Sequence, residues 1–92
     1  MTPHNLQVTI AATNTPQRLT TTNTKAYQIV FQNNAAHVMR IGDSTTTSTV
    51  GLVLSAGGGA ANAVPRIVQD TDLTDWYVNG TQNDVLDILY LA

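Results

Sequence analysis

The sequence has no cysteine and no glutamate, and Lys25 is its only lysine. Without cysteine there is no disulfide framework and no thiolate metal site, so cysteine usage does not indicate the redox compartment of the protein. Glutamate and lysine are the usual residues of solvent-exposed helix faces, and their scarcity argues against helices. Charged residues make up 11% of the chain, against about 25% in ordinary globular domains. The polar surface is therefore built mainly from threonine, asparagine and glutamine.

Positive charge is also scarce and scattered, and the formal net charge is -2. The four cations are Arg18, Lys25, Arg40 and Arg66, which form no basic cluster of the kind that binds phosphates. The N-terminal stretch MTPHNLQ has no basic region followed by an apolar run, which argues against a secretory signal. No apolar run approaches bilayer length. We therefore expect neither a nucleic acid nor a membrane as partner.

The residues that are present favour strands. Threonine, valine and isoleucine suit pleated strands, while asparagine and glycine suit the turns between them. Ninety-two residues make one domain, residues 1–92. We predict an all-β, antiparallel β-sandwich, jelly-roll-like, with seven or eight short strands. The predicted strands are Leu6–Ile10, Arg18–Thr20, Tyr27–Gln32, Val38–Ile41, Gly51–Leu54, Val64–Val68, Trp76–Val78 and Val85–Leu91.

The stretch Gly42-Asp43-Ser44 resembles the nucleophile block of one esterase family. A nucleophilic serine needs a base within hydrogen-bond reach, normally a histidine oriented by a carboxylate. That family places its histidine late in the chain, and no histidine follows His37 here. We expect a turn instead, in which the glycine supplies an unusual backbone angle and the Asp43 side chain caps the backbone.

Two further patterns also favour turns over chemistry. The triplet Gly57-Gly58-Gly59 has neither the spacing nor the lysine of a phosphate loop, and Pro65 stands where a helix would run. Asp70, Asp72 and Asp75 offer oxygen ligands for calcium, but the glycine and closing glutamate of a calcium loop are missing. His4 and His37 do not suggest a metal pair. We therefore expect no catalytic, cofactor-binding or metal site, and no enzymatic activity.

The closing strand Val85–Leu91 is apolar on both faces. Leu86, Ile88 and Tyr90 share one face, and Val85, Leu89 and Leu91 share the other. An antiparallel sandwich of this size normally shows one sheet face to water. Two interpretations remain open: Val85, Leu89 and Leu91 form an oligomer interface, or the strand is buried centrally in a barrel. At the other terminus, residues 1–5 are expected to form a flexible arm.

A rhythm of strands and turns runs through four segments: Asn33–Ser44, Gly51–Gly57, Leu73–Thr81 and Val85–Tyr90. This rhythm resembles that of small virion proteins of tailed bacteriophages. These comprise capsid decoration (cement) proteins and related β-sandwich domains of head and tail fibres. The resemblance implies a jelly-roll-like fold, often trimeric, that binds the major capsid protein on the outside of the assembled head, after synthesis in the bacterial host cytoplasm. It also implies that an arm of Thr2, Pro3, His4 and Asn5 orders on the shell, unless that segment is a frayed terminus.

An alternative from another class is a fibre-type attachment module that binds a host-surface glycan or protein. Trp76 and Tyr77, beside the Asn79-Gly80 turn, offer an aromatic platform for it. Because adjacent residues of a strand point to opposite faces, only one of the two can meet a ligand. A lone tryptophan in a small domain more often packs in the core. A small hydrolase built on Ser44 is a formal third alternative.

Overall fold

The computed structural model describes residues 2–57, 61–63 and 71–92, and within these ranges the protein is all-β. Ten strands and a single 3-10 turn are present in the described ranges, so the predicted all-β class is confirmed. Three short strands were not predicted: Lys25–Ala26, Ala61–Ala63 and Thr71–Asp72. The elements are β1 Pro3–Thr9, β2 Gln17–Arg18, β3 Lys25–Ala26, β4 Gln28–Asn33, β5 Met39–Gly42, β6 Leu52–Leu54, β7 Ala61–Ala63, β8 Thr71–Asp72, η1 Leu73–Asp75, β9 Tyr77–Asn79 and β10 Val85–Leu91.

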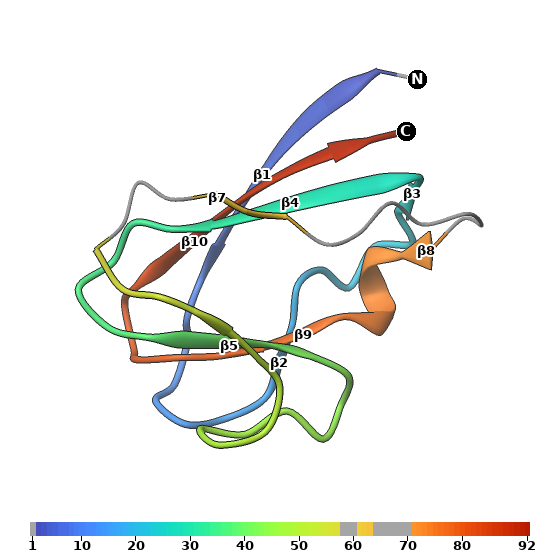
Figure 1. Cartoon of the computed structure of the whole chain (residues 1–92). Coiled ribbons are helices and arrows are strands. Elements are labelled where there is room, and N and C mark those ends of the chain that lie inside the picture. The colour runs from blue at the N-terminus through green and yellow to red at the C-terminus, as the bar shows by residue number, and fades with distance from the viewer. Residues whose placement is uncertain (1, 58–60, 64–70) are drawn as a thin grey trace.

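The strands form two antiparallel four-stranded sheets that face each other as a sandwich (Figure 1). The first sheet has the order β1-β10-β4-β7, the second has the order β2-β9-β5-β6, and β3 pairs with β8 beside them. The pairs are nested: β5–β6 is innermost, followed by β4–β7, β3–β8, β2–β9 and β1–β10. The chain is therefore one long antiparallel ribbon, and the contacts β10–β4 and β9–β5 close it into two layers.

The core lies between the two sheets and follows the alternation of the strands. Ile29 and Phe31 share one face of β4 and are almost fully buried. Burying such a side chain contributes about 1.5–3 kcal/mol, so this cluster is the main source of stability. The buried apolar residues are Val8, Ile10, Leu19, Ala26, Ile29, Phe31, Met39, Ile41, Leu54, Leu73, Val78, Leu86 and Ile88.

Several predicted elements differ from the structure. No strand was predicted between Leu54 and Val64, whereas Ala61–Ala63 pairs with β4 as β7. The polar turn predicted at Asp70–Asp75 contains β8 and η1. The strand predicted at Val64–Val68, with Pro65, lies outside the described residues. Alanine and aspartate are poor strand formers, so here pairing with a distant strand overrides local preference.

The tight-turn signal Asn79-Gly80 does not join two paired strands. It links β9 of the second sheet to β10 of the first, so the chain crosses between layers there. Gly80 is buried, and a Cβ at Gly80 would lie 3.2 Å from side-chain atoms of both Ile10 and Met39. The glycine is needed because the core approaches the backbone closely, and not because a hairpin requires it.

The expected flexible arm at residues 1–5 is wrong for the part of it that the structure describes. Pro3, His4 and Asn5 belong to β1 and pair with Leu91, Tyr90 and Leu89 of β10. Thr2 and Ala92 exchange backbone hydrogen bonds of 2.7 and 3.0 Å, which places the two ends of the chain side by side (Figure 1). A neighbouring strand satisfies the backbone groups of this segment, which is why a polar, proline-containing stretch is ordered.

Candidate functional site

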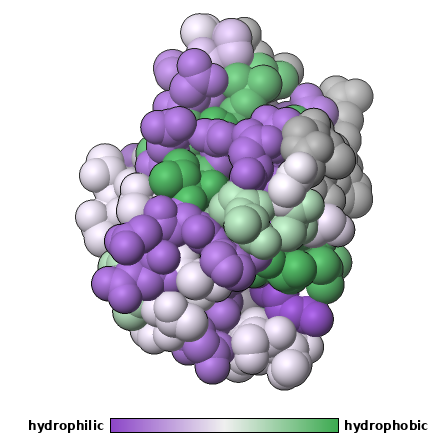
Figure 2. Space-filling model, turned by 90° about the vertical axis from the view of Figure 1, so that its left-hand side faces the viewer, coloured by the Kyte–Doolittle hydropathy of each residue, from purple (hydrophilic) through white to green (hydrophobic). Residues whose placement is uncertain are grey.

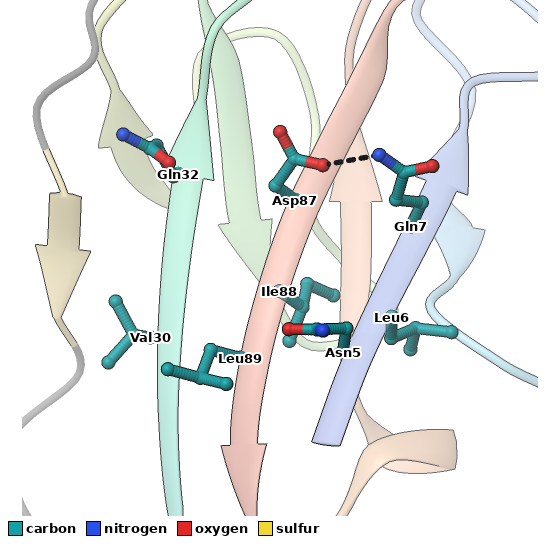
Figure 3. Close-up of a pocket in the computed structure, with 8 residues that line it drawn as sticks. All are labelled: Asn5, Leu6, Gln7, Val30, Gln32, Asp87, Ile88 and Leu89. Atoms are coloured by element: carbon teal, nitrogen blue, oxygen red, sulfur yellow. Dashed lines mark hydrogen bonds between the residues drawn. The ribbon is translucent and has the colours of Figure 1, made fainter. Parts of the chain in front are cut away.

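The outer face of the first sheet, on β1, β10 and β4, carries a shallow groove of about 670 Å³. The register sets two rows of side chains across it: Asn5 beside Leu89 and Val30, and Gln7 beside Asp87 and Gln32. Figure 3 shows these side chains projecting from the three strands. The lining is completed by Leu6 and Ile88, which belong to the inner face of the sheet. We call the residues of β1, β10 and β4 that point away from the core the outer face: Asn5, Gln7, Val30, Gln32, Val85, Asp87, Leu89 and Leu91.

The polar row is organised by one carboxylate. Asp87 Oδ1 accepts a hydrogen bond of 2.9 Å from Gln7 Nε2, and Asp87 Oδ2 accepts one of 3.1 Å from Asn34 Nδ2. Neutral amides on β1 and at the end of β4 therefore hold the carboxylate from both sides. Among the described residues that line the groove, Asp87 is the single ionisable group. The row can exchange hydrogen bonds with a partner while presenting little charge.

The apolar part of the outer face contains the three residues predicted to contact another subunit. Leu89 exposes 42% of its surface, while Val85 and Leu91 are half-buried. Leu86 and Ile88 point into the core, so the predicted division of this strand into two faces is observed. β10 lies centrally in its sheet, between β1 and β4, yet its outer face is open to solvent. Subunit contact through Val85, Leu89 and Leu91 stays a prediction.

Four other residues that line the groove were not predicted as site residues: Gln7, Val30, Gln32 and Asp87. They come from strands that are far apart in the chain, and only the pairing of β10 with both β1 and β4 brings them together. The available signal was the alternation of Val30 with the core residues Ile29 and Phe31, which places an apolar side chain on the second face of β4.

A second group of exposed apolar side chains lies on and near the opposite sheet. Val38, Val50, Leu52 and Val53 expose 52%, 52%, 61% and 48% of their surfaces. Leu52 and Val53 belong to β6, an edge strand of the second sheet. The sequence predicted the strand but not its position at an edge, because position in a sheet depends on pairing. Figure 2 views the molecule from the left-hand side of Figure 1, and on that side the hydrophobic residues are separated by hydrophilic ones.

Trp76 and Tyr77 do not form a joint platform. Trp76 is half-buried and packs against the core, with its ring centroid 5.7 Å from that of Phe31. Its indole N–H donates a hydrogen bond of 3.0 Å to Thr71 Oγ1. Tyr77 is half-buried, and the Arg18 guanidinium lies 5.4 Å from the centre of its ring. Trp76 therefore packs against the core, as expected for a lone tryptophan in a small domain. The Arg18 guanidinium lies over the Tyr77 ring.

The Gly42-Asp43-Ser44 stretch forms a capped turn. Asp43 Oδ1 accepts hydrogen bonds from the Thr45 hydroxyl and from the Thr45 backbone N–H, and these hold the pKa of Asp43 below 3.8. The predicted reason for Gly42 is wrong. Its φ is not in the left-handed region, but a Cβ there would lie 2.8 Å from the buried Thr46 hydroxyl. The glycine makes room for a side chain.

No catalytic pair forms around Ser44 in the described part of the chain. Ser44 follows β5 and His37 precedes it, so the two residues lie beyond opposite ends of a strand about 13 Å long. His37 Nδ1 lies 2.9 Å from Asp84 Oδ2 instead, and the His4 ring stacks on Tyr90 at 5.1 Å. The structure therefore does not bring a histidine to the candidate nucleophile.

The described residues of the candidate calcium and phosphate sites form or cap turns. Asp72 caps η1 by accepting hydrogen bonds of 2.9 Å from Thr74 N–H and 3.0 Å from Thr24 N–H. Asp70, Gly58 and Gly59 lie outside the described residues. Within the described ranges, no group of three or more histidine, cysteine or acidic side chains is placed to hold a metal ion. The same ranges contain no helix long and apolar enough to cross a membrane.

Comparison with protein-family models, with curated proteins and with solved structures gave no match to this chain.

Proposed function

We propose that this protein is a non-enzymatic structural protein of a tailed-bacteriophage particle, a decoration protein that binds the outside of the assembled head. The observation that carries the proposal is the outer face of the first sheet. There the exposed Leu89 lies among the half-buried Val30, Val85 and Leu91. Amides and one carboxylate flank these residues. Protein interfaces are depleted of charge at their centre, and this face has that character.

The topology supports assigning the sandwich to the jelly-roll class. Eight of the strands make two four-stranded sheets from one nested antiparallel ribbon, and β3–β8 adds a short extra pair. Jelly rolls are double-sheet sandwiches of eight strands, and viral capsid domains are among the proteins that use them. A fold of this kind hosts several functions. The fold alone therefore does not define the function, and the proposal depends on the outer face.

The mechanism is linkage between binding and assembly. Each copy contacts neighbouring subunits of the shell, the major capsid protein being the partner. A site shared between two shell subunits exists only after they assemble, so binding stabilises the assembled state and opposes its separation. Because Pro3–Asn5 are paired in β1, they contribute to this contact as a strand surface and not as a free arm.

The test is a binding experiment with purified assembled heads and with unassembled shell subunits. We expect tight binding to assembled heads and little binding to free subunits. Equal binding to both forms would contradict the proposal. Binding to host cells without binding to heads would support the fibre-type attachment module instead.

Matched variants locate the contact face. Leu89→Asp places a charge in the outer face, and Val53→Asp places one at a similarly exposed position on β6 of the opposite sheet; the two side chains are 42% and 48% exposed. We expect Leu89→Asp to abolish binding to heads and Val53→Asp to leave it unchanged. The free energy of unfolding of both variants should lie within about 0.5 kcal/mol of that of the parent, because each position is at the surface. The opposite pattern would move the contact to the second sheet.

A further inference from the structure

The free edge of β1 has a hydrogen-bonding pattern that the register defines. Thr2 and Ala92 exchange two backbone hydrogen bonds, and Ile10 bonds to Asp84 and Asn83 at the other end of the strand. Residues of an antiparallel strand alternate in the side to which their backbone groups point. The even-numbered residues of β1 therefore bond to β10, and the odd-numbered residues direct their N–H and C=O groups to the open side.

Gln17 shows the same alternation and limits the open edge. Its side-chain Nε2 donates to the Thr9 carbonyl at 3.0 Å, and its Oε1 accepts from the Ala11 N–H at 2.9 Å. Pro3 limits the other end, because proline has no N–H. Between these limits, Asn5 and Gln7 each offer both an N–H and a C=O toward the open side. In the described part of the chain, β1 pairs with β10 alone, and both residues are exposed. Figure 3 shows their side chains on β1, beside β10.

We propose that β1 pairs with β1 of a second copy of this chain, antiparallel, about a two-fold axis through Leu6. In that register Asn5 of one copy faces Gln7 of the other, so each N–H meets a C=O. Pro3 then faces Thr9. Pro3 lacks a donor exactly where the Thr9 carbonyl is already bonded to Gln17, and the Thr9 N–H meets the Pro3 carbonyl.

The neighbouring registers do not satisfy the same groups. With the axis through Asn5, Pro3 faces Gln7, and the Gln7 carbonyl has no donor. With the axis through Gln7, Asn5 faces Thr9, and the Asn5 N–H meets a carbonyl that Gln17 occupies. Unpaired backbone groups are costly. The register through Leu6 is therefore selected among the three.

The side chains of β1 also permit self-pairing. None of the residues Pro3–Thr9 is Asp, Glu, Lys or Arg. Two copies of β1 therefore meet without repulsion between charged side chains of these types. Natural edge strands usually carry charge or a bulge to block pairing of this kind. The dimer joins two first sheets and places two outer faces side by side. This inference concerns the chain alone and does not rest on the proposed function.

The first test uses Asn5→Pro and analytical ultracentrifugation. The Asn5 N–H points away from β10, so proline removes an edge donor and keeps the ladder of the folded chain. We expect the parent protein to form a dimer and Asn5→Pro to weaken dimerisation by about tenfold or more, since the donor is lost in both copies. Asn5→Ala keeps the backbone donor and should dimerise like the parent. A monomeric parent, a trimer, or an unaltered dimer of Asn5→Pro would overturn the proposal.

The second test checks the register and holds even if Asn5→Pro does not fold. The chain has no cysteine, so an introduced thiol is the only one. Leu6→Cys places two thiols at a non-hydrogen-bonded pair across the axis, about 4.5 Å apart at Cα, which suits a disulfide. In His4→Cys the thiols lie about 13 Å apart along the strands. We expect mild oxidation to cross-link Leu6→Cys and not His4→Cys, and the reverse result would overturn this register.

Discussion

Single polar side chains supply hydrogen bonds to the backbone where strands end. Asn33 is fully buried; its Nδ2 donates to the carbonyls of His37 and Leu54 at 2.8 and 3.0 Å, and its Oδ1 accepts from the Ala35 N–H. The Arg40 guanidinium binds two carbonyls of the β5–β6 loop in a similar way. Each of these side chains fixes a loop that has no ladder of its own, because it donates hydrogen bonds to carbonyls that no neighbouring strand reaches.

We predict that Asn33→Ala destabilises the fold by about 2 kcal/mol or more, since it leaves buried carbonyls without a donor. Asn34→Ala is the matched control on the same segment. Asn34 is exposed, and its removal should change the free energy of unfolding by about 0.5 kcal/mol at most. Urea denaturation followed by circular dichroism measures both. Equal effects would show that the buried amide is not the anchor of this turn.

We also predict that Ser44→Ala leaves function unchanged. Ser44 is exposed in the turn after β5, at the opposite end of that strand from His37. The free energy of unfolding should change by about 1 kcal/mol at most. Hydrolysis of small activated esters is the corresponding activity assay. Activity in the parent that disappears in the variant would establish Ser44 as a nucleophile.

At the scale of elements, the small β3–β8 sheet and η1 form one unit held by Asp72. The carboxylate accepts from Thr74 and Thr24, and Leu73 N–H donates to the Thr24 carbonyl at 2.9 Å. Leu73 is fully buried. The cap therefore anchors a core residue, and it connects two short strands that are marginal alone.

The Asp72 cap predicts a dependence of stability on acid. The Thr74 N–H, then the Thr24 N–H and the Thr74 hydroxyl, lower the pKa of Asp72 below 3.8. A carboxyl whose pKa is lower in the folded state stabilises the fold above its unfolded pKa. This stabilisation is lost as the pH falls through the folded pKa.

The measurement is the Tm of the parent and of Asp72→Asn between pH 7 and pH 2. The variant keeps the Oδ1 acceptor and loses the charge, so its Tm should be lower at pH 7 and should approach that of the parent below about pH 4. Asp75→Asn, exposed in the same turn, is the control and should change the Tm little at any pH. A constant difference between parent and Asp72→Asn would exclude the charge as the cause.

At the scale of the whole molecule, low charge and a two-sided sandwich determine how contacts form. The outer face of the first sheet offers Leu89 and an amide row, and the second sheet exposes Leu52 and Val53. The net charge of -2 leaves little long-range attraction to any charged partner. Contacts of this protein should therefore depend on apolar burial and hydrogen bonds.

We predict that binding to assembled heads survives high salt. At about 1 M salt the Debye length falls to about 3 Å, which screens exposed ion pairs but leaves apolar contacts intact. The affinity for heads should therefore change by about threefold or less between 0.05 and 1 M salt, on the order expected when few ion pairs contribute. Loss of binding at moderate salt would show that ion pairs hold the complex together. It would contradict binding through the outer face.

The residues of the chain by themselves determined the secondary-structure class and much of the strand pattern. The period-two alternation in Tyr27–Gln32 and Val85–Leu91 divided the side chains of each strand into two faces, because successive side chains of a strand point to opposite sides of the sheet. The capping role of Asp43 also followed from its own side chain. Such features depend on residues a few positions apart, and local chemistry decides them.

The tertiary structure decided the features that depend on distant partners. Pairing with β10 orders Pro3–Asn5, which otherwise look like a tail, and pairing with β4 makes a strand of Ala61–Ala63. The groove joins Gln7, Val30 and Asp87, which no sequence period relates. Which strands pair, and which stay at an edge, depends on the free energy of the whole sandwich: long-range contacts must offset the entropy of closing long loops, and no local window of residues contains that balance.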